Sequence, residues 1–374
     1  MLENKLEVFK DIEPYSDKKV RETLKWLETN EEFARGIQFF YPSWTREEVL
    51  TRLQFCKTCA DFQVQFIVDT INRSIYDTMD SLEIVGLESI DTPNCLYISN
   101  HRDIFLDSAL LQNKLHELGK PFTEISLGDN LVVNDVMLAV SKLNNMFTVL
   151  RSNSKSEMLK NSINLSSYLR YSITEKRVSS WIAQKNGRTK DGNDVTAPGL
   201  IKMLLLSGGG DIKKAVAELN IVVSTISYEY EPCAFEKANE LSVFEKEGTY
   251  KKSEFENLYS IVNGINDPKG HVKLVFEKLD VDNINFTNNR KKDVISVANE
   301  MDRVVYKNYQ LRKTNYIAHD LLYNDDKYRH HYKQDEVAAF EKYLSKAKNE
   351  DIYHRLLKVY ATPIHNKEKL EKKN

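Results

Sequence analysis

Seven short apolar runs alternate with longer helical stretches in the middle of the chain, and this alternation constrains the fold most strongly. Strands that alternate with helices are typical of βαβ units, in which parallel strands are joined by helical crossovers. The pattern therefore predicts an α/β fold with a mostly parallel sheet and flanking helices. The expected strands are residues 82–85, 95–99, 122–126, 146–150, 180–183, 221–228 and 271–276. The expected helices between them are residues 107–118, 134–143, 155–176 and 200–219, the last interrupted by a loop at 207–210.

Helical periodicity replaces this alternation at both ends of the chain. Near the start, Val20, Leu24 and Leu27 share one helical face, and Thr45 with Glu48 forms a capping-box pattern. A further apolar stripe at helical spacing begins at about residue 290.

These patterns divide the chain into three expected parts. They are an N-terminal helical region (1–80), an α/β domain (81–325) and a C-terminal helical segment (326–374).

Charge and hydropathy limit the partners and the cellular location that are expected for the protein. Lys+Arg number 53 and Asp+Glu number 55, so the net charge is −2, and the positive field of a nucleic-acid binder is not expected. No run approaches the roughly 20 apolar residues of a membrane span, since Lys202 interrupts the best candidate at 200–206. The first residues have no signal-peptide core, and the four scattered cysteines fit a reducing compartment. A cytoplasmic protein, soluble or peripheral on a membrane, is expected.

The most informative polar segment is residues 99–107, which follows the second expected strand. Ligands in open α/β sheets usually bind beyond the carboxyl ends of the strands. His101 at this place could act as a general base, and a nearby carboxylate could orient its ring. The alternative interpretation is a polar loop whose Asp caps the next helix.

Two further strand ends carry cations. The fourth expected strand ends in Arg151, and the fifth leads into a loop that contains Lys185, Gly187, Arg188 and Lys190. Arg can hold a phosphate through two parallel hydrogen bonds, and glycine lets backbone N–H groups approach an anion. The alternatives are a solvated arginine and an ordinary exposed basic turn.

Taken in order, these segments resemble the motif blocks of the glycerolipid acyltransferase family. Asn100-His101 with Asp107 resembles the family's Asn/Ser-His-x4-Asp block, and the strand ending in Arg151 resembles its second block. Gly187-Arg188-Thr189 resembles the third block. The strand ending in Tyr228-Glu229 resembles the fourth block of the glycerol-3-phosphate acyltransferase branch.

Three positions depart from the family pattern. Five residues, not four, separate His101 from Asp107, so that Leu106 stands where the family has Asp. Asp107 is favoured as the partner of His101 because it leads into an apolar helix, and Asp103 is the second choice. Lys185 occupies the usual place of a Glu, and Val223 that of a Pro.

The resemblance implies a fatty acyl transfer in phospholipid synthesis. His101 would deprotonate a hydroxyl of glycerol 3-phosphate or lysophosphatidic acid, with Asp107 holding the ring. The hydroxyl would attack acyl-CoA or acyl carrier protein directly, with no metal or redox cofactor. The expected acceptor-binding residues are Arg151, Gly187, Arg188, Thr189 and Lys190.

The same resemblance implies a peripheral location on the inner face of the membrane. The alternatives are O-acylation of another lipid acceptor, such as an acylated amino acid, and a non-catalytic lipid-binding protein of the same fold.

Overall fold

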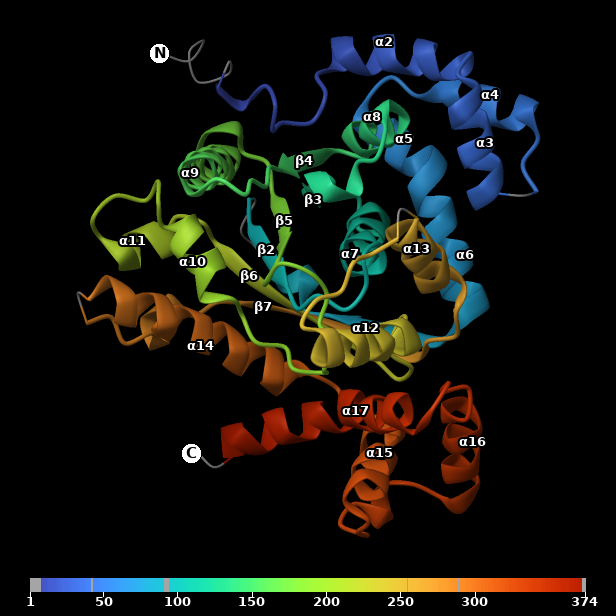
Figure 1. The fold of residues 1–374 in the computed structure, drawn as a ribbon. Coiled ribbons are helices and arrows are strands. Elements are labelled where there is room, and N and C mark those ends of the chain that lie inside the picture. Colours follow the sequence, from blue (N-terminus) through green and yellow to red (C-terminus); the bar gives the residue numbers. More distant parts are fainter. Residues whose placement is uncertain (1–7, 42, 91–93, 254, 288, 372–374) are drawn as a thin grey trace.

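A computed structural model describes residues 8–41, 43–90, 94–253, 255–287 and 289–371 (Figure 1). Its centre is a seven-stranded sheet in the order β1-β7-β6-β2-β5-β3-β4. The strands are β1 (Met79–Val85), β2 (Leu96–Ser99), β3 (Glu124–Gly128), β4 (Met146–Val149), β5 (Ser180–Ala183), β6 (Ile221–Tyr228) and β7 (Gly270–Lys278). The strands from β6 to β4 run parallel to one another, whereas β7 is antiparallel to β6 and parallel to β1. The predicted fold class is confirmed, and each expected strand is present.

The helices agree with the predicted pattern except in one region. The N-terminal helices are α2 (Asp17–Glu28), α3 (Glu31–Phe40), α4 (Arg46–Phe55), α5 (Cys59–Phe62) and α6 (Asp69–Thr78). The helices between the strands are α7 (Leu106–Glu117), α8 (Asp135–Leu143), α9 (Lys155–Tyr171), α10 (Pro198–Leu204), α11 (Ile212–Ala217), α12 (Ala234–Glu247) and α13 (Glu256–Asn266). The last ones are α14 (Arg290–Asn308), α15 (Lys313–Tyr323), α16 (Gln334–Leu344) and α17 (Glu350–Glu371).

The sequence pattern did not predict α12 and α13. In α12 the buried positions hold Ala234, Lys237, Ala238 and Ser242, which are small or polar residues. Their spacing is helical, but an apolar stripe is the signal that periodicity depends on. The α12 segment therefore has no apolar stripe from which its helical structure could be predicted.

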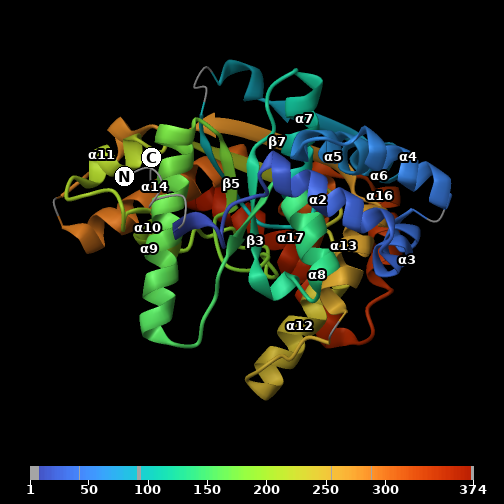
Figure 2. The same cartoon turned by 90° about the horizontal axis from the view of Figure 1, so that it is seen from above.

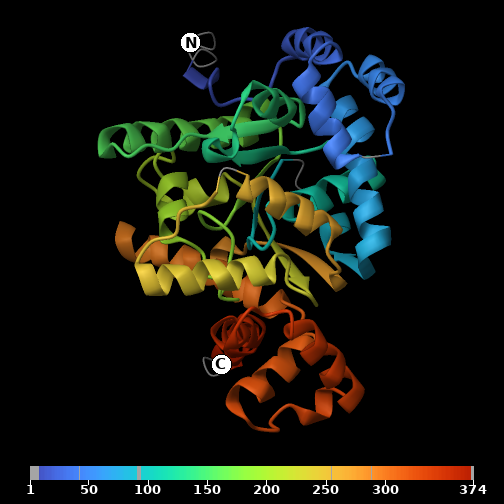
Figure 3. The same ribbon diagram turned by 45° about the vertical axis from the view of Figure 1, so that its right-hand side comes forward.

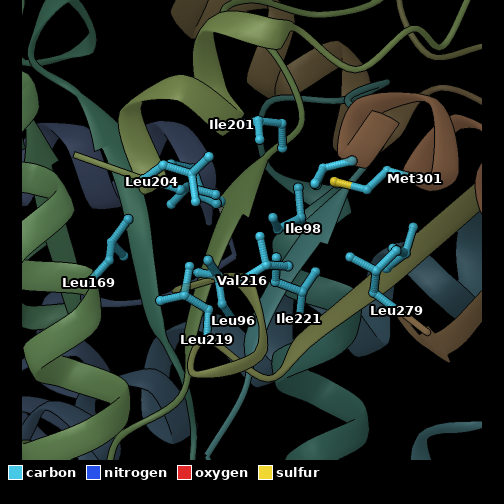
Figure 4. Close-up of a cluster of buried hydrophobic side chains, with 14 of the residues drawn as sticks. Leu96, Ile98, Leu169, Ile201, Leu204, Val216, Leu219, Ile221, Leu279 and Met301 are labelled. Carbon is cyan, nitrogen blue, oxygen red and sulfur yellow. The ribbon is translucent and has the colours of Figure 1, made fainter. Parts of the chain in front are cut away.

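Side chains alternate across the sheet and form a core on each face. Leu96 and Ile98 of β2 join the cluster under α9, α10 and α14, with Met301 of α14 among its members (Figure 4). Tyr97, between them in the sequence, packs on the opposite face against Leu110 of α7. This two-residue period is that of a strand buried on both faces.

Two smaller apolar clusters pack the N-terminal and C-terminal helices against the rest of the protein. The N-terminal helices pack against α8 through Val136 and Leu143. At the other end, α15, α16 and α17 enclose a cluster that includes Ala234 and Ala238 of α12, and they lie together below the sheet (Figures 1 and 3). The described helices include none with the length and hydropathy that crossing a bilayer requires.

One glycine joins the loop after β5 to the C-terminal helix. Gly192 has φ of +76°, and a Cβ there would lie 2.1 Å from the backbone oxygen of Val359 in α17. Only a residue without a side chain allows this approach.

We therefore expect Gly192→Ala to lower the free energy of unfolding by about 2 kcal/mol or more, because the added methyl group is strained and collides with backbone. Urea unfolding followed by circular dichroism would measure this. Gly199→Ala is the matched control, since Gly199 has open space around its Cβ position and lies in α10. Equal midpoints for the two variants would show that the Gly192 contact does not constrain the fold.

Candidate active site

The sequence-predicted residues gather at the carboxyl edge of the parallel strands. His101 follows β2, which lies between β5 and β6 in the sheet. The loop after β5 reaches His101 directly, since the backbone N–H of Thr189 donates to the carbonyl of His101 at 2.6 Å. Sheet topology thus brings together segments that are almost ninety positions apart in sequence.

His101 and Asp107 form a hydrogen-bonded pair. Nδ1 of His101 lies 3.0 Å from Oδ2 of Asp107, in the first turn of α7. A carboxylate only accepts, so Nδ1 carries the ring proton and Nε2 presents a lone pair. The His101 side chain is 15% exposed, and within the described residues no hydrogen bond is made by Nε2. The geometry is that of a base oriented by an acid.

Further donors fix the carboxylate itself. The backbone N–H groups of Arg102 and Asp103 donate to the same Oδ2 at 2.6 and 2.9 Å. The hydroxyl of Tyr228, at the end of β6, donates to Oδ1 at 3.3 Å. Burial, together with the nearby carboxylates of Asp107 and Asp103, raises the pKa of Tyr228 well above its usual value and keeps it protonated as a donor.

Asp103 has a different task from Asp107. Its Oδ1 accepts from the backbone N–H groups of Phe105 and Leu106, both at 2.8 Å, so it caps the start of α7. Its Oδ2 points at Gly264 of α13, where a Cβ would lie 2.2 Å away. Burial, and then the charge of Asp107, raises the pKa of Asp103. Helix capping and ring orientation are thus both present, on two different carboxylates.

A cluster of four buried charges includes Arg102, the residue after His101. Arg102 contacts Asp194 at 2.7 Å and Glu231 at 2.9 Å, and Lys237 contacts Glu231 at 2.5 Å. Lys237 also donates to the carbonyl of Arg102 at 2.6 Å. Burial alone would lower the pKa of Arg102, but Asp194 and Glu231 outweigh it and raise that pKa. The two cations and two anions neutralise one another inside the protein.

Asn100 and Thr189 connect this cluster to the strands and to the loop after β5. The Asn100 amide donates to Asp194 at 2.9 Å and exchanges hydrogen bonds with the backbone of Ile226 in β6. The Thr189 hydroxyl donates to Asp194 at 2.8 Å. Thr189 is buried, so in this structure it positions the loop rather than presenting its hydroxyl to solvent.

Arg188 is the cation of this loop whose guanidinium is incompletely paired. Its side chain is buried, with 9% of the residue exposed, and its Nη2 donates to Ser260 Oγ of α13 at 3.1 Å. Its buried Nη1 has no hydrogen-bond partner in the part of the chain that the structure describes. A buried guanidinium nitrogen without an acceptor is costly, and an anion bound there would remove the cost. Gly187 beside it has φ of +78° and open space at the Cβ position.

The other predicted cations have protein partners. Lys190 forms an ion pair with Glu240 of α12, and Lys185 donates to the carbonyl of Asn193 at 3.0 Å. Arg151 is exposed, and its Nη2 donates to Asn186 at 2.7 Å, two positions before Arg188. Arg151 therefore lies beside the loop after β5, whereas Lys190 is directed toward α12.

Several residues of the site had no signal in the sequence. Asp194, Glu231, Lys237 and Ser260 belong to no motif, and their contacts with Arg102 and Arg188 span 72 to 135 positions. Tyr228 was noticed only as the end of a strand motif. Polarity after a strand end is a general signal that could have suggested Glu231, which follows β6, but not Lys237 and Ser260, which lie within α12 and α13.

The large cavity of about 1100 Å³ lies elsewhere, at the amino ends of the strands. Its lining includes Asn94 before β2, Ser179 before β5 and Glu124 at the start of β3. This is the opposite edge of the sheet from His101, so the cavity does not belong to the candidate active site.

Among the residues that the structure describes, two groups of side chains have the composition of a metal site. They are Asp80 with Glu229 and His271, and His319 with Asp320 and Asp325. In the first group, Glu229 accepts from the backbone of His271. In the second, Asp320 accepts from Tyr328 and Tyr332. Neither group includes His101 or its partners.

The buried charges make a testable contribution to stability. Burial alone would raise the pKa of Asp194, but Arg102 and hydrogen bonds from Asn100 and Thr189 outweigh it and lower that pKa from 3.8. A lowered pKa in the folded state means that this stabilisation is fully present above about pH 4 and is lost as the pH falls further.

We expect Asp194→Asn to cost about 3–5 kcal/mol of unfolding free energy near neutral pH, because it leaves Arg102 with one anion fewer. The difference from wild type should shrink below about pH 4. Urea titrations at both pH values would measure it, with exposed Asp191→Asn as the control. A constant difference across this range would contradict the assigned role of Asp194.

No protein-family model matches the chain, and no curated protein sequence matches it. Among solved structures, the chain is similar to the crystal structure of the 1-acyl-sn-glycerophosphate (LPA) acyltransferase PlsC from Thermotoga maritima. The identity is 13% and the TM-score 0.35, over 77% of this chain and 98% of that chain. At this distance the likeness assigns no chemistry, which has to be argued from the geometry of the site.

Proposed function

We propose that the protein is an acyltransferase that moves a fatty acyl group from an acyl thioester to a hydroxyl of a glycerol phosphate. The observation that carries the proposal is the combination of an oriented His101–Asp107 pair with the incompletely paired guanidinium of Arg188 at the same sheet edge. A base and an anion site at one edge of the sheet suit an acceptor that has both a hydroxyl and a phosphate.

The base would act through Nε2 of His101. The acceptor hydroxyl gives its proton to Nε2 while its oxygen attacks the thioester carbonyl carbon. The new C–O bond forms, the C–S bond breaks, and the proton passes from His101 to the leaving thiolate. The Asp107 carboxylate stabilises the imidazolium that exists between these two transfers.

The surroundings of His101 support direct transfer without an acyl-enzyme. Among the described residues, no Ser, Thr or Cys side chain has a hydrogen bond to the ring. Cys233 is buried at the start of α12, and burial raises the pKa of its thiol to about 11. A thiol in this state is a poor nucleophile. The acceptor hydroxyl is then the group that His101 activates.

Arg188 would bind the acceptor phosphate and so orient the hydroxyl. Its Nη1 offers donors that the described part of the chain leaves without an acceptor, and Gly187 leaves space beside it. Orientation of this kind can lower the barrier by up to about 7–11 kcal/mol. Arg151, linked to the same loop through Asn186, would add positive charge.

The finer assignment follows the motif resemblance. The Tyr228-Glu229 pair and the Gly187–Lys190 loop resemble those of glycerol-3-phosphate acyltransferases. We therefore propose glycerol 3-phosphate as the preferred acceptor and lysophosphatidic acid as the second candidate, with acyl-CoA or acyl carrier protein as donor. The reaction would belong to phospholipid synthesis, at the inner face of the membrane.

Removal of the base should abolish the reaction. We expect His101→Ala and Asp107→Asn to lower kcat by about 10²- to 10⁴-fold, measured as thioester consumption with glycerol 3-phosphate present. His116→Ala is the matched control, because this histidine of α7 stacks on Phe122 away from the site. If wild type and His101→Ala consumed the thioester equally slowly, the acyltransferase proposal would be rejected in favour of a non-catalytic lipid-binding protein.

Loss of the anion site should weaken binding of the acceptor and leave binding of the thioester unchanged. We expect Arg188→Ala to raise the acceptor KM by about 10- to 100-fold, the value of a hydrogen bond to a charged group. Lys190→Ala should change it much less, because Lys190 is paired with Glu240. A panel of acceptors should then prefer those with phosphate, and a preference for phosphate-free lipids such as acylated amino acids would contradict the role of Arg188.

A further inference from the structure

Helix α13 lies between α6 and α12 and borders the candidate active site (Figures 1 and 2). Ser260, near its middle, accepts a hydrogen bond from Nη2 of Arg188 at 3.1 Å. We propose that α13 is a movable cover, which shifts away from Arg188 to admit the phosphate of the acceptor. The identity of that ligand rests on the proposed function, whereas the movement is inferred from the contacts of α13 itself.

Two buried polar atoms without a hydrogen-bond partner lie beside α13. They are Nη1 of Arg188 and Oδ2 of Asp103, and both lack a partner within the described part of the chain. Ser260 contacts the guanidinium of Arg188, and a Cβ on Gly264 would lie 2.2 Å from Oδ2 of Asp103. Ser260 and Gly264 are four residues apart, so they lie on one face of the helix. One face of α13 therefore covers both side chains.

This arrangement is that of a closed site. Nη1 of Arg188 is enclosed by protein atoms and out of contact with solvent. A phosphate oxygen has to come within about 3 Å of a guanidinium nitrogen to accept a hydrogen bond from it. Because α13 packs on the same guanidinium through Ser260, a phosphate reaches Nη1 only when this helix moves outward.

The closed position is also unfavourable for the two covered atoms. A buried polar atom without a partner has lost its hydration and has gained no hydrogen bond in return. Outward movement of α13 would give Nη1 of Arg188 and Oδ2 of Asp103 access to water or to a ligand. The unpaired atoms therefore favour opening, and a bound phosphate would favour it further.

Hydrogen bonds attach α13 to its neighbours. On one side, the Ser74 hydroxyl of α6 donates to the carbonyl of Ile265 at 2.8 Å. On the other side, the amide of Asn263 donates to Glu236 of α12 at 2.8 Å. Two further donors reach backbone carbonyls of α13, and they are Cys233 and Lys269.

Apolar packing adds little to these hydrogen bonds. The fully buried residues of α13 are Ser260 and Gly264. Its four aliphatic residues are only half-buried, and they are Leu258, Ile261, Val262 and Ile265. None of the four apolar clusters formed by the described residues includes a residue of α13. A cavity of about 90 Å³ lies between α13, α6 and α3. An element with few buried apolar contacts opens at a low cost in free energy.

Hydrogen exchange tests the movement without a thioester. We would follow backbone amide exchange in the full chain by mass spectrometry, with glycerol 3-phosphate, with glycerol and with neither. Amides of α13 should exchange at least about tenfold faster than those of α14, whose Val297 and Met301 belong to the core. Saturating glycerol 3-phosphate should accelerate exchange in α13 further, because the phosphate displaces the helix from Arg188. Glycerol should have no effect, and Arg188→Ala should abolish the response to glycerol 3-phosphate.

Gly264→Ala tests the closed position through the sign of its effect. Alanine normally stabilises a helix relative to glycine, and it would then slow exchange. At position 264 the added Cβ collides with the Asp103 carboxylate, so this variant should hold α13 away and accelerate exchange. Gly199→Ala is the matched control, because Gly199 lies in α10 with open space at its Cβ position and should not accelerate exchange there.

The outcomes separate this inference from the proposed function. Three results would overturn the cover, namely exchange in α13 as slow as in α14, exchange that glycerol 3-phosphate does not accelerate, and slower exchange in Gly264→Ala than in wild type. Acyl transfer is measured separately. If glycerol 3-phosphate accelerates exchange in α13 but is not acylated, the cover is supported and the acyltransferase is rejected. If acylation proceeds while α13 does not respond, the cover is rejected and the acyltransferase stands.

Discussion

The buried contacts of Arg102 hold the candidate site together. Its guanidinium joins Asp194 from the loop after β5 to Glu231 from the segment after β6, and Lys237 of α12 completes the cluster. Four charges are stable inside a protein only when each is paired and hydrogen-bonded. The pairing therefore fixes the loop after β5, the segment after β6 and α12 relative to one another. His101 lies between Asn100 and Arg102, which are both fixed by this cluster, and its backbone has little freedom to move.

The polar side chains around this cluster are of two kinds. Some are paired within the protein and hold its segments in place, and others keep an atom without a hydrogen-bond partner. Asp103 caps α7, Thr189 holds its loop, and Lys190 is neutralised by Glu240. Within the described part of the chain, Nε2 of His101 and Nη1 of Arg188 are among the polar atoms that have no hydrogen-bond partner. A site in which a base and a cation each keep an unused nitrogen is suited to binding a ligand that brings both a proton donor and an anion.

The agreement between sequence and structure has a physical limit that α12 illustrates. The strands were found because a buried strand must present consecutive apolar residues. The sequence pattern does not predict α12, because its buried residues include Ala234, Ala238 and Ser242. These small side chains let the helix backbone pack closely, and they leave no stripe of large apolar residues. The same limit applies to the site. Both Asp103 and Asp107 are close enough to His101 in the sequence to be its partner. The turn into α7 decides between them, because it directs the Asp103 carboxylate to the start of the helix and the Asp107 carboxylate to the His101 ring.

By itself, the sequence determined the α/β class, the strands, and the segments at strand ends where chemistry would be found, because local periodicity and strand-end polarity are properties of neighbouring residues. The tertiary structure alone decided which charges are free and which are paired. Lys190 meets Glu240 across 50 positions, and Arg102 meets Glu231 across 129. Such pairs depend on where strands and helices come together in space, and a chain of near-neutral total charge does not reveal them until it is folded.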